Sequence, residues 1–112
     1  MSQLVVLESA ADTGGEFVEV EALFPAGAPA SPERLLSGHE VRIEVLEGRL
    51  ELVVNGSRRP LRAGEALTVA PGTPHRLSVA EGTGPARFLW RVRPAPADDG
   101  LLEKVFGLAA KD

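Results

Sequence analysis

The chain has 112 residues, which is the usual size of one domain, and its 44% hydrophobic content is typical of a folded rather than a disordered protein. It contains no cysteine, which excludes disulfides, thiolate metal ligands and a cysteine nucleophile. The net charge of −4 disfavours a nucleic-acid partner, and the lack of any apolar run near the ~20 residues that span a bilayer disfavours a membrane partner.

Most of the chain alternates between apolar and polar residues with a period of two, the pattern of strands that bury one face. In chain order, the residues that share the predicted buried face are Val18, Val20, Ala22 and Phe24; His39, Val41, Ile43 and Val45; Leu50, Leu52 and Val54; Leu67 and Val69; His75, Leu77 and Val79; and Phe88, Trp90 and Val92. Nothing resembles a βαβ unit. The pattern therefore predicts an all-β sandwich or barrel over about residues 3–93, within a single domain over 1–112.

Turn residues separate these strands. Glu47-Gly48 and Asn55-Gly56 predict tight hairpins, because such turns need positive backbone φ. Further turns are predicted at Pro60, Gly64, Pro71-Gly72, Pro74 and Gly82 to Pro85. Arg58-Arg59 is the only adjacent basic pair and follows the second hairpin, so we interpret it as a solvated edge rather than a nucleic-acid site.

The C-terminal segment has a different pattern. After Pro94, Asp98 or Asp99 can cap a short helix from about Gly100 to Lys111. Its apolar stripe comprises Leu101, Leu102, Val105, Phe106, Leu108 and Ala109. A helix this short is marginal alone, so it must pack on its own barrel or on a partner subunit.

Two stretches resemble the sequence motifs of the cupins, a family of small double-sheet barrels. Arg42-Ile-Glu-Val-Leu-Glu-Gly48, followed by Arg49-Leu-Glu-Leu, is similar to the end of the first cupin motif. Gly64-Glu-Ala-Leu-Thr-Val-Ala-Pro-Gly72-Thr-Pro-His75 is similar to the second, Gly-x5-Pro-x-Gly-x2-His, with Ala70 in place of the first proline. The resemblance covers about half the chain. It implies a small type-2 cupin, a double-stranded β-helix (jelly-roll) barrel to which the C-terminal helix would be appended.

The resemblance also implies a degenerate metal site. In cupins that bind metal, the first motif supplies His-x-His and a glutamate, and the second supplies one more histidine. Carried over residue by residue, the glutamate position is Val41, the His-x-His positions are Arg34-Leu35-Leu36, and only His75 is retained. The chain has two histidines in total, so no three-histidine site can form within it. We therefore expect no cofactor.

The first functional hypothesis is a metal-free, largely apolar barrel pocket that binds a small molecule, with an anion as one candidate ligand. The candidate ligand-binding residues are His75, Arg34, His39, Leu36, Val41, Ile43 and Trp90. His75 is also the candidate catalytic residue, because histidine exchanges protons near neutral pH. Each polar candidate also has a purely structural interpretation: His75 bonded to backbone or water, His39 in an exposed loop, and Arg34 turned outward toward Glu33. Trp90 can equally be a core residue.

The second hypothesis is a metal-dependent cupin enzyme of the oxygenase or isomerase type with a reduced site. His39, His75 and the Glu40 carboxylate would hold a divalent metal with open positions. Strand parity argues against this set, because Glu40 should point away from His39.

The third hypothesis is a non-catalytic scaffold or sensor domain that forms a homodimer. The outward-facing apolar residues that predict a covered sheet face are Phe17, Leu23, Leu46, Val53 and Leu89. Cupins are frequently dimers, so the resemblance implies the same assembly. The Met-Ser-Gln-Leu start lacks the basic head and apolar stretch of a secretory signal, so we expect a cytoplasmic protein.

Overall fold

The computed structural model describes residues 3–26, 38–80 and 84–95. The strands that it describes are β1 (Gln3–Glu8), β2 (Val18–Phe24), β3 (Glu40–Glu47), β4 (Arg49–Val54), β5 (Ser57–Arg62), β6 (Ala66–Val69), β7 (His75–Val79) and β8 (Ala86–Arg93). The predicted helix over 100–111 lies outside the described residues. Within those residues, no helix has the length and apolar character needed to cross a membrane.

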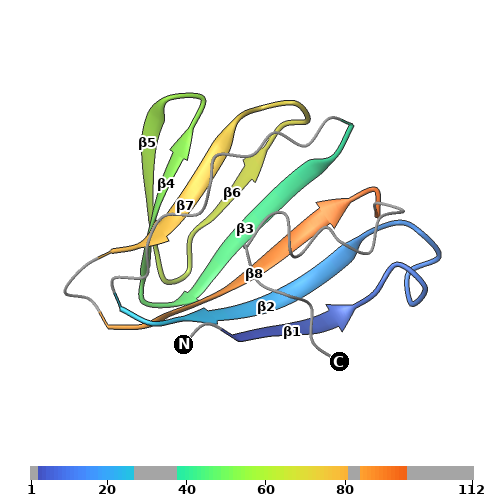
Figure 1. Ribbon diagram of the computed structural model, residues 1–112, viewed down its shortest axis with the longest axis horizontal. Helices are drawn as coiled ribbons and strands as arrows, with labels where there is room; N and C mark the ends of the chain where they lie inside the picture. Colours follow the sequence, from blue (N-terminus) through green and yellow to red (C-terminus); the bar gives the residue numbers. More distant parts are fainter. Residues whose placement is uncertain (1–2, 27–37, 81–83, 96–112) are drawn as a thin grey trace.

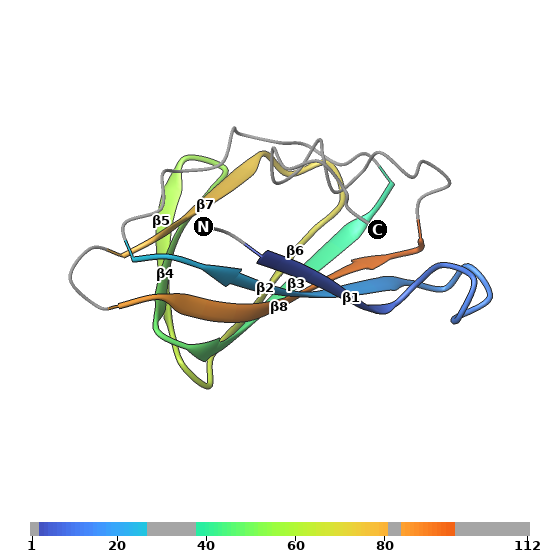
Figure 2. The same cartoon turned by 60° about the horizontal axis from the view of Figure 1, so that its bottom comes forward.

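The strands form two antiparallel sheets. The larger has the order β1-β2-β8-β3-β6, and the smaller has the order β5-β4-β7 (Figure 1). Neighbours such as β2 and β8 are distant in sequence because the chain crosses repeatedly from one sheet to the other. Figure 2 shows the two sheets curving around a common interior. This topology is a jelly-roll barrel, and the predicted all-β fold class is confirmed.

The core fills the space between the sheets, and the predicted alternation places it there. The buried apolar residues are Val20, Ala22, Phe24, Val41, Ile43, Val45, Leu50, Leu52, Leu61, Val69, Leu77, Val79, Ala86, Phe88, Trp90 and Val92. Phe24 and Phe88 meet edge to face, with ring centroids 5.5 Å apart. The partly buried apolar residues that pack against this cluster are Leu4, Val18, Val54 and Leu67.

Gly48 is not in a hairpin, contrary to the sequence prediction. β3 pairs with β6 and β8, whereas β4 pairs with β5 and β7, so the chain changes sheets at Gly48. Gly48 has a φ of 79°, and a Cβ there would lie 2.5 Å from the Pro85 carbonyl oxygen. Hairpins and this corner both require positive φ. The sequence therefore predicted the backbone conformation of Gly48 correctly, but not that the chain passes to the other sheet there.

The Asn55-Gly56 hairpin is confirmed. It joins β4 to β5, and both residues have positive φ, 51° and 81°. The predicted turn at Pro60 is wrong, because Pro60 lies within β5 opposite Glu51. β5 is an edge strand, and an edge is where a strand tolerates proline.

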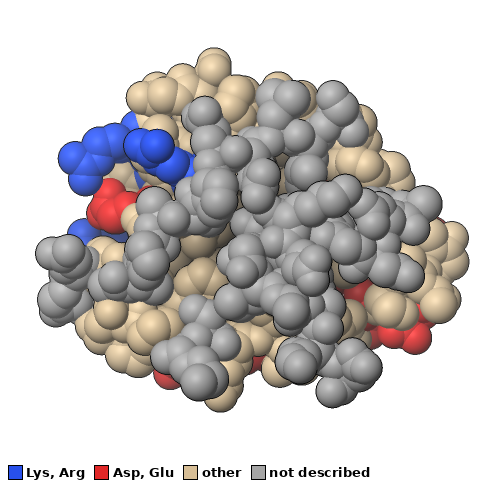
Figure 3. Space-filling model, in the orientation of Figure 1, with Lys and Arg blue, Asp and Glu red and all other residues tan. Residues whose placement is uncertain are grey.

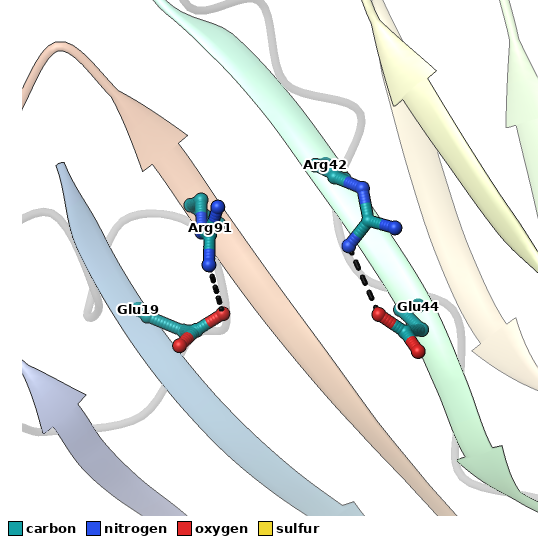
Figure 4. Close-up of polar contacts among 4 residues, drawn as sticks. All are labelled: Glu19, Arg42, Glu44 and Arg91. Atoms are coloured by element: carbon teal, nitrogen blue, oxygen red, sulfur yellow. Dashed lines mark hydrogen bonds and ion pairs between the residues drawn. The ribbon is translucent and has the colours of Figure 1, made fainter.

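The outer face of the larger sheet is covered mostly by charged side chains. Figure 4 shows two of its ion pairs, Glu19 with Arg91 at 3.0 Å and Arg42 with Glu44 at 2.9 Å. Of the apolar residues predicted to face outward, Leu23 is exposed, and the half-buried ones are Phe17, Leu46, Val53 and Leu89.

Candidate functional site

His75 is the buried polar residue of the described core, with 4% of its surface exposed. It is the first residue of β7, and it shares a face with Leu77 and Val79, which are 3% exposed each. The alternation of the strand therefore directs its imidazole between the sheets, as the sequence predicted. The buried side chains that the structure describes in this interior are otherwise apolar.

A short rigid turn sets the position of His75. The Thr73 N–H donates to the Ala70 carbonyl at 3.2 Å, and Gly72 takes a φ of 75°. The Pro74 carbonyl then accepts the Asn55 N–H at 2.8 Å. This bond ties the turn to the β4–β5 hairpin, so two turns fix the start of β7.

One ring nitrogen of His75 is engaged by its own turn. Nδ1 lies 3.1 Å from the Thr73 carbonyl oxygen. A carbonyl can only accept, so Nδ1 carries the proton of this bond. In the neutral ring Nε2 then holds a lone pair, which makes it a hydrogen-bond acceptor and a proton acceptor.

His39 is held by a different element. It lies immediately before β3, is half-buried, and its Nδ1 is 2.8 Å from the Pro94 carbonyl oxygen just after β8. The bond joins the start of β3 to the end of β8, which are paired through Glu40 and Arg93. β3 and β7 both begin at the same end of the barrel, because Val41 pairs with Val69 and the chain then turns to His75.

The remaining candidates divide into residues that the structure describes and residues that it does not. Val41, Ile43 and Trp90 are buried at 1%, 0% and 0% exposure and belong to the core cluster. Arg34 and Leu36 lie outside the described residues, so the direction of the Arg34 guanidinium stays a prediction.

The residues present do not fit the metal set that the motifs imply. At the glutamate position stands Val41, a side chain with no donor atom, and it faces the interior. Glu40 is exposed on the opposite face of β3. Over the described ranges, no three His, Asp or Glu residues gather closely enough to hold an ion. Transition metals need several converging N, O or S ligands, so one interior imidazole is a poor ion site.

Sequence reasoning missed the two carbonyl groups that hold the histidines, those of Thr73 and Pro94. Neither could be found from residue types, because a backbone carbonyl is present at every position. Only the Pro-Gly-Thr-Pro turn hinted that the strand beginning at His75 would be rigidly positioned.

Comparison with known proteins adds a family match. Residues 20–92 match the family model described as a cupin domain. The match spans every strand but β1, from the first buried residues of β2 to the end of β8. No curated protein matches the sequence significantly.

Solved structures with the same fold are numerous and distant in sequence. KdgF from Halomonas sp. has a TM-score of 0.72 at 20% identity, covering 90% of this chain and 84% of that one. A predicted oxalate decarboxylase from Thermotoga maritima has a TM-score of 0.76 at 18% identity, covering 83% and 80%. Ectoine synthase from P. lautus has a TM-score of 0.74 at 18% identity, covering 92% and 71%. At these identities the likeness is one of fold.

Proposed function

This chain belongs to the cupin domain family, and from that premise we propose that it binds a small molecule inside its barrel, beside His75, without the metal set of the family's motifs. The observation that carries the proposal is a buried imidazole, 4% exposed, whose Nδ1 is already bonded to the Thr73 carbonyl. A polar group in an apolar interior is costly unless it is hydrogen-bonded. Its remaining nitrogen, Nε2, is a polar contact that the described part of this site can offer a ligand.

The geometry of the ring favours one class of ligand. With Nδ1 donating to Thr73, the neutral imidazole offers an acceptor at Nε2, so the matching ligand donates an O–H or N–H. The apolar interior, which includes Val41 and Ile43, favours an apolar body for the rest of the molecule. A small molecule with an apolar body and one donor group therefore fits best.

Two further considerations support a small-molecule ligand. Two of the structural relatives are named for small molecules, ectoine and oxalate, although their identities to this chain are only 18%. The motif turn before His75 also persists where the other metal ligand positions do not. A turn that only closed a barrel would not require a histidine.

Phenol and benzoate are a matched pair of probes, because they share a ring and differ in offering a donor or an anion. We expect phenol to bind the wild-type protein weakly, at a Kd of about a millimolar, and to perturb the His75 ring signals in NMR. His75→Leu should abolish that binding. Arg59→Ala, on exposed β5, is the matched control and should bind phenol as the wild type does.

Three outcomes would contradict the proposal. Binding of benzoate but not phenol would assign the site to an anion and to a cationic side chain rather than to the Nε2 acceptor. Equal phenol binding by wild type and His75→Leu would remove His75 from the site. Tight, stoichiometric uptake of Fe(II), Mn(II), Ni(II) or Zn(II) would contradict the metal-free interpretation.

A further inference from the structure

The outer face of the smaller sheet carries an excess of positive charge. Leu50, Leu61 and Leu77 are buried on its inner face, so the residues next to them in each strand point outward. We call this outer surface the arginine face, and its ionisable residues are Arg49 and Glu51 on β4, Arg58 and Arg62 on β5, and Arg76 on β7. Four arginines and one glutamate give it a formal charge of +3, in a chain whose net charge is −4. Figure 3 shows basic side chains gathered on the side where Figure 1 draws β4 and β5.

The arginine face balances its charges less completely than the outer face of the larger sheet does. On the larger sheet, three arginines lie within 3.0 Å of a glutamate carboxylate: Arg42, Arg87 and Arg91. On the arginine face, Glu51 accepts a hydrogen bond from Arg58 at 3.0 Å. Among the residues that the structure describes, the other three arginines of this face form no ion pair. Its surplus charge is therefore available to a partner.

Two of these arginines repel each other directly. Arg49 and Arg62 are exposed cross-strand partners, and like charges in that position destabilise a sheet. Glu65 does not offset this repulsion, because its Oε1 accepts the Arg62 backbone N–H at 2.7 Å. A carboxylate from outside the chain would offset it, as Glu19 and Glu44 do for the neighbouring arginines of the larger sheet.

The register of the strands divides the arginine face into two basic ends. Arg49 and Arg62 form one end, two residues from Glu51 along the strands. Arg58 and Arg76 form the other end, because they pair with Val53 from its two sides. The two ends are four residues apart, which is about 13 Å at the spacing of a strand. Glu51 lies between them, so the centre of the face disfavours a further negative charge.

We propose that the arginine face binds an acidic segment of another protein, in extended conformation along the strands. The segment has acidic residues at positions i and i+4 and a neutral residue at i+2. Residues an even number apart in an extended chain point to the same side, and four residues span about 13 Å, which matches the two basic ends. Arginine suits this partner because its planar guanidinium donates two parallel bonds to one carboxylate.

The same features disfavour a nucleic acid and a strand added to the sheet edge. A continuous phosphate backbone crossing the face would meet Glu51 at its centre. The face also has no aromatic side chain on which bases could stack. At the β5 edge, Pro60 has no N–H to donate to an added strand. A protein segment lying on the face is therefore the better match.

Two labelled peptides test the spacing. In Gly-Glu-Val-Thr-Val-Glu-Gly, blocked at both ends, the glutamates are four residues apart; in Gly-Glu-Val-Thr-Glu-Val-Gly they are three apart and point to opposite sides. We expect fluorescence anisotropy at low salt to give the first a Kd on the order of 0.1–1 mM. The second should bind ~10-fold more weakly. Added salt should weaken both, because the contacts are exposed charges.

Charge reversal tests the face itself. Arg49→Glu and Arg76→Glu, one at each basic end, should each weaken binding of the first peptide by ~10-fold or more. Arg93→Glu is the matched control, since it reverses an exposed arginine on the larger sheet and should keep the wild-type affinity. Circular dichroism verifies that every variant is folded.

Each alternative outcome overturns a definite part of the proposal. Undetectable binding of the first peptide, or equal weakening by Arg93→Glu, would remove the arginine face as a specific site. Equal affinity for the two peptides would overturn the i and i+4 spacing. A short DNA duplex that binds more tightly than the peptide, and that also depends on Arg49 and Arg76, would assign the face to a phosphate backbone instead.

Discussion

The two faces of the larger sheet are chemically opposite, although the same strands build both. On the inner face Val20, Trp90 and Ile43 lie side by side across β2, β8 and β3, and each is 0% exposed. The adjacent row, one residue earlier in β2 and β3 and one residue later in β8, has Glu19, Arg42 and Arg91 on the outer face. The difference shows how little sequence is needed to assign a face, since a shift of one residue exchanges core for solvent.

The outer row also shows how like charges are accommodated. Arg42 and Arg91 are direct cross-strand neighbours, a destabilising arrangement if both charges stood alone. Figure 4 shows that each guanidinium instead turns to its own carboxylate, Arg91 to Glu19 and Arg42 to Glu44. These ion pairs therefore serve mainly to offset the repulsion between neighbouring arginines on a solvent-facing surface.

Substitutions of two neighbouring residues on β8 give the strongest test of the difference between the inner and outer faces of the larger sheet. Phe88→Ala, on the inner face, should lower the free energy of unfolding by about 3–5 kcal/mol, because it leaves a cavity in the core. Leu89→Ala, on the half-buried outer face, should cost about 1 kcal/mol or less. Urea denaturation measures both. Equal losses would show that the outer face is as tightly packed as the inner one.

The corner at Gly48 determines which residues form the inner face. Odd residues point inward in β3 and even residues in β4, so the alternation changes across the corner. Gly48→Ala should cost about 3 kcal/mol or more, because the new Cβ meets Pro85 backbone in addition to the strain of positive φ.

Gly56→Ala is the matched control for that substitution. Its φ of 81° is similar, but a Cβ there would have nothing within 4 Å. It should cost about 1–2 kcal/mol from backbone strain alone. Thermal unfolding of the two variants separates the clash from the strain, and equal costs would show that the corner relaxes.

Sequence alone predicted the inner face and the Asn55-Gly56 hairpin, but not the pairing of strands that are distant in sequence. Alternation placed Val41 and Phe88 inside, and both are buried. It did not assign β1, whose central residues are uninterrupted apolar, and it predicted a turn at Pro60, which lies within β5. The direction of the chain at Gly48 depends on pairing between strands far apart in sequence, which no local pattern contains.

For the candidate site, too, the sequence predicted which face a residue occupies but not its contacts. Parity placed His75 inside, and its burial agrees. The hydrogen bond that orients the ring was not predictable, because it depends on how the turn aims the Thr73 carbonyl. The pocket role of Arg34 stays a prediction.

Among the ion pairs, the less exposed pair should contribute more to stability than the more exposed pair. Glu19 and Arg91 have side chains 14% and 33% exposed, whereas Glu51 and Arg58 are 29% and 80% exposed at the same 3.0 Å. Double-mutant cycles should give a coupling of about 1 kcal/mol for Glu19–Arg91 and about 0.2 kcal/mol for Glu51–Arg58. Stronger coupling in the more exposed pair would contradict this ordering.

The smallest predicted effect on stability comes from hydrogen bonds to Asp12 in an exposed loop. The Ser9 backbone N–H donates to Asp12 Oδ2 at 3.0 Å, and the Ser9 hydroxyl accepts the Asp12 N–H at 3.2 Å. Hydrogen bonds from Ser9, the backbone one first and the side-chain one second, lower the pKa of Asp12. The stabilisation is therefore present above the ordinary carboxyl pKa and is lost as pH falls through the lowered one.

An NMR titration of the Asp12 carboxyl measures this directly. Ser9→Ala should raise the pKa of Asp12 only part of the way to its ordinary value, because the backbone N–H, the larger cause, remains. Asp12→Asn should reduce stability slightly at neutral pH and not at all once the carboxyl is protonated. A full return of the pKa in Ser9→Ala would show that the hydroxyl, and not the backbone, holds the charge, and that the loop opens when the hydroxyl is removed.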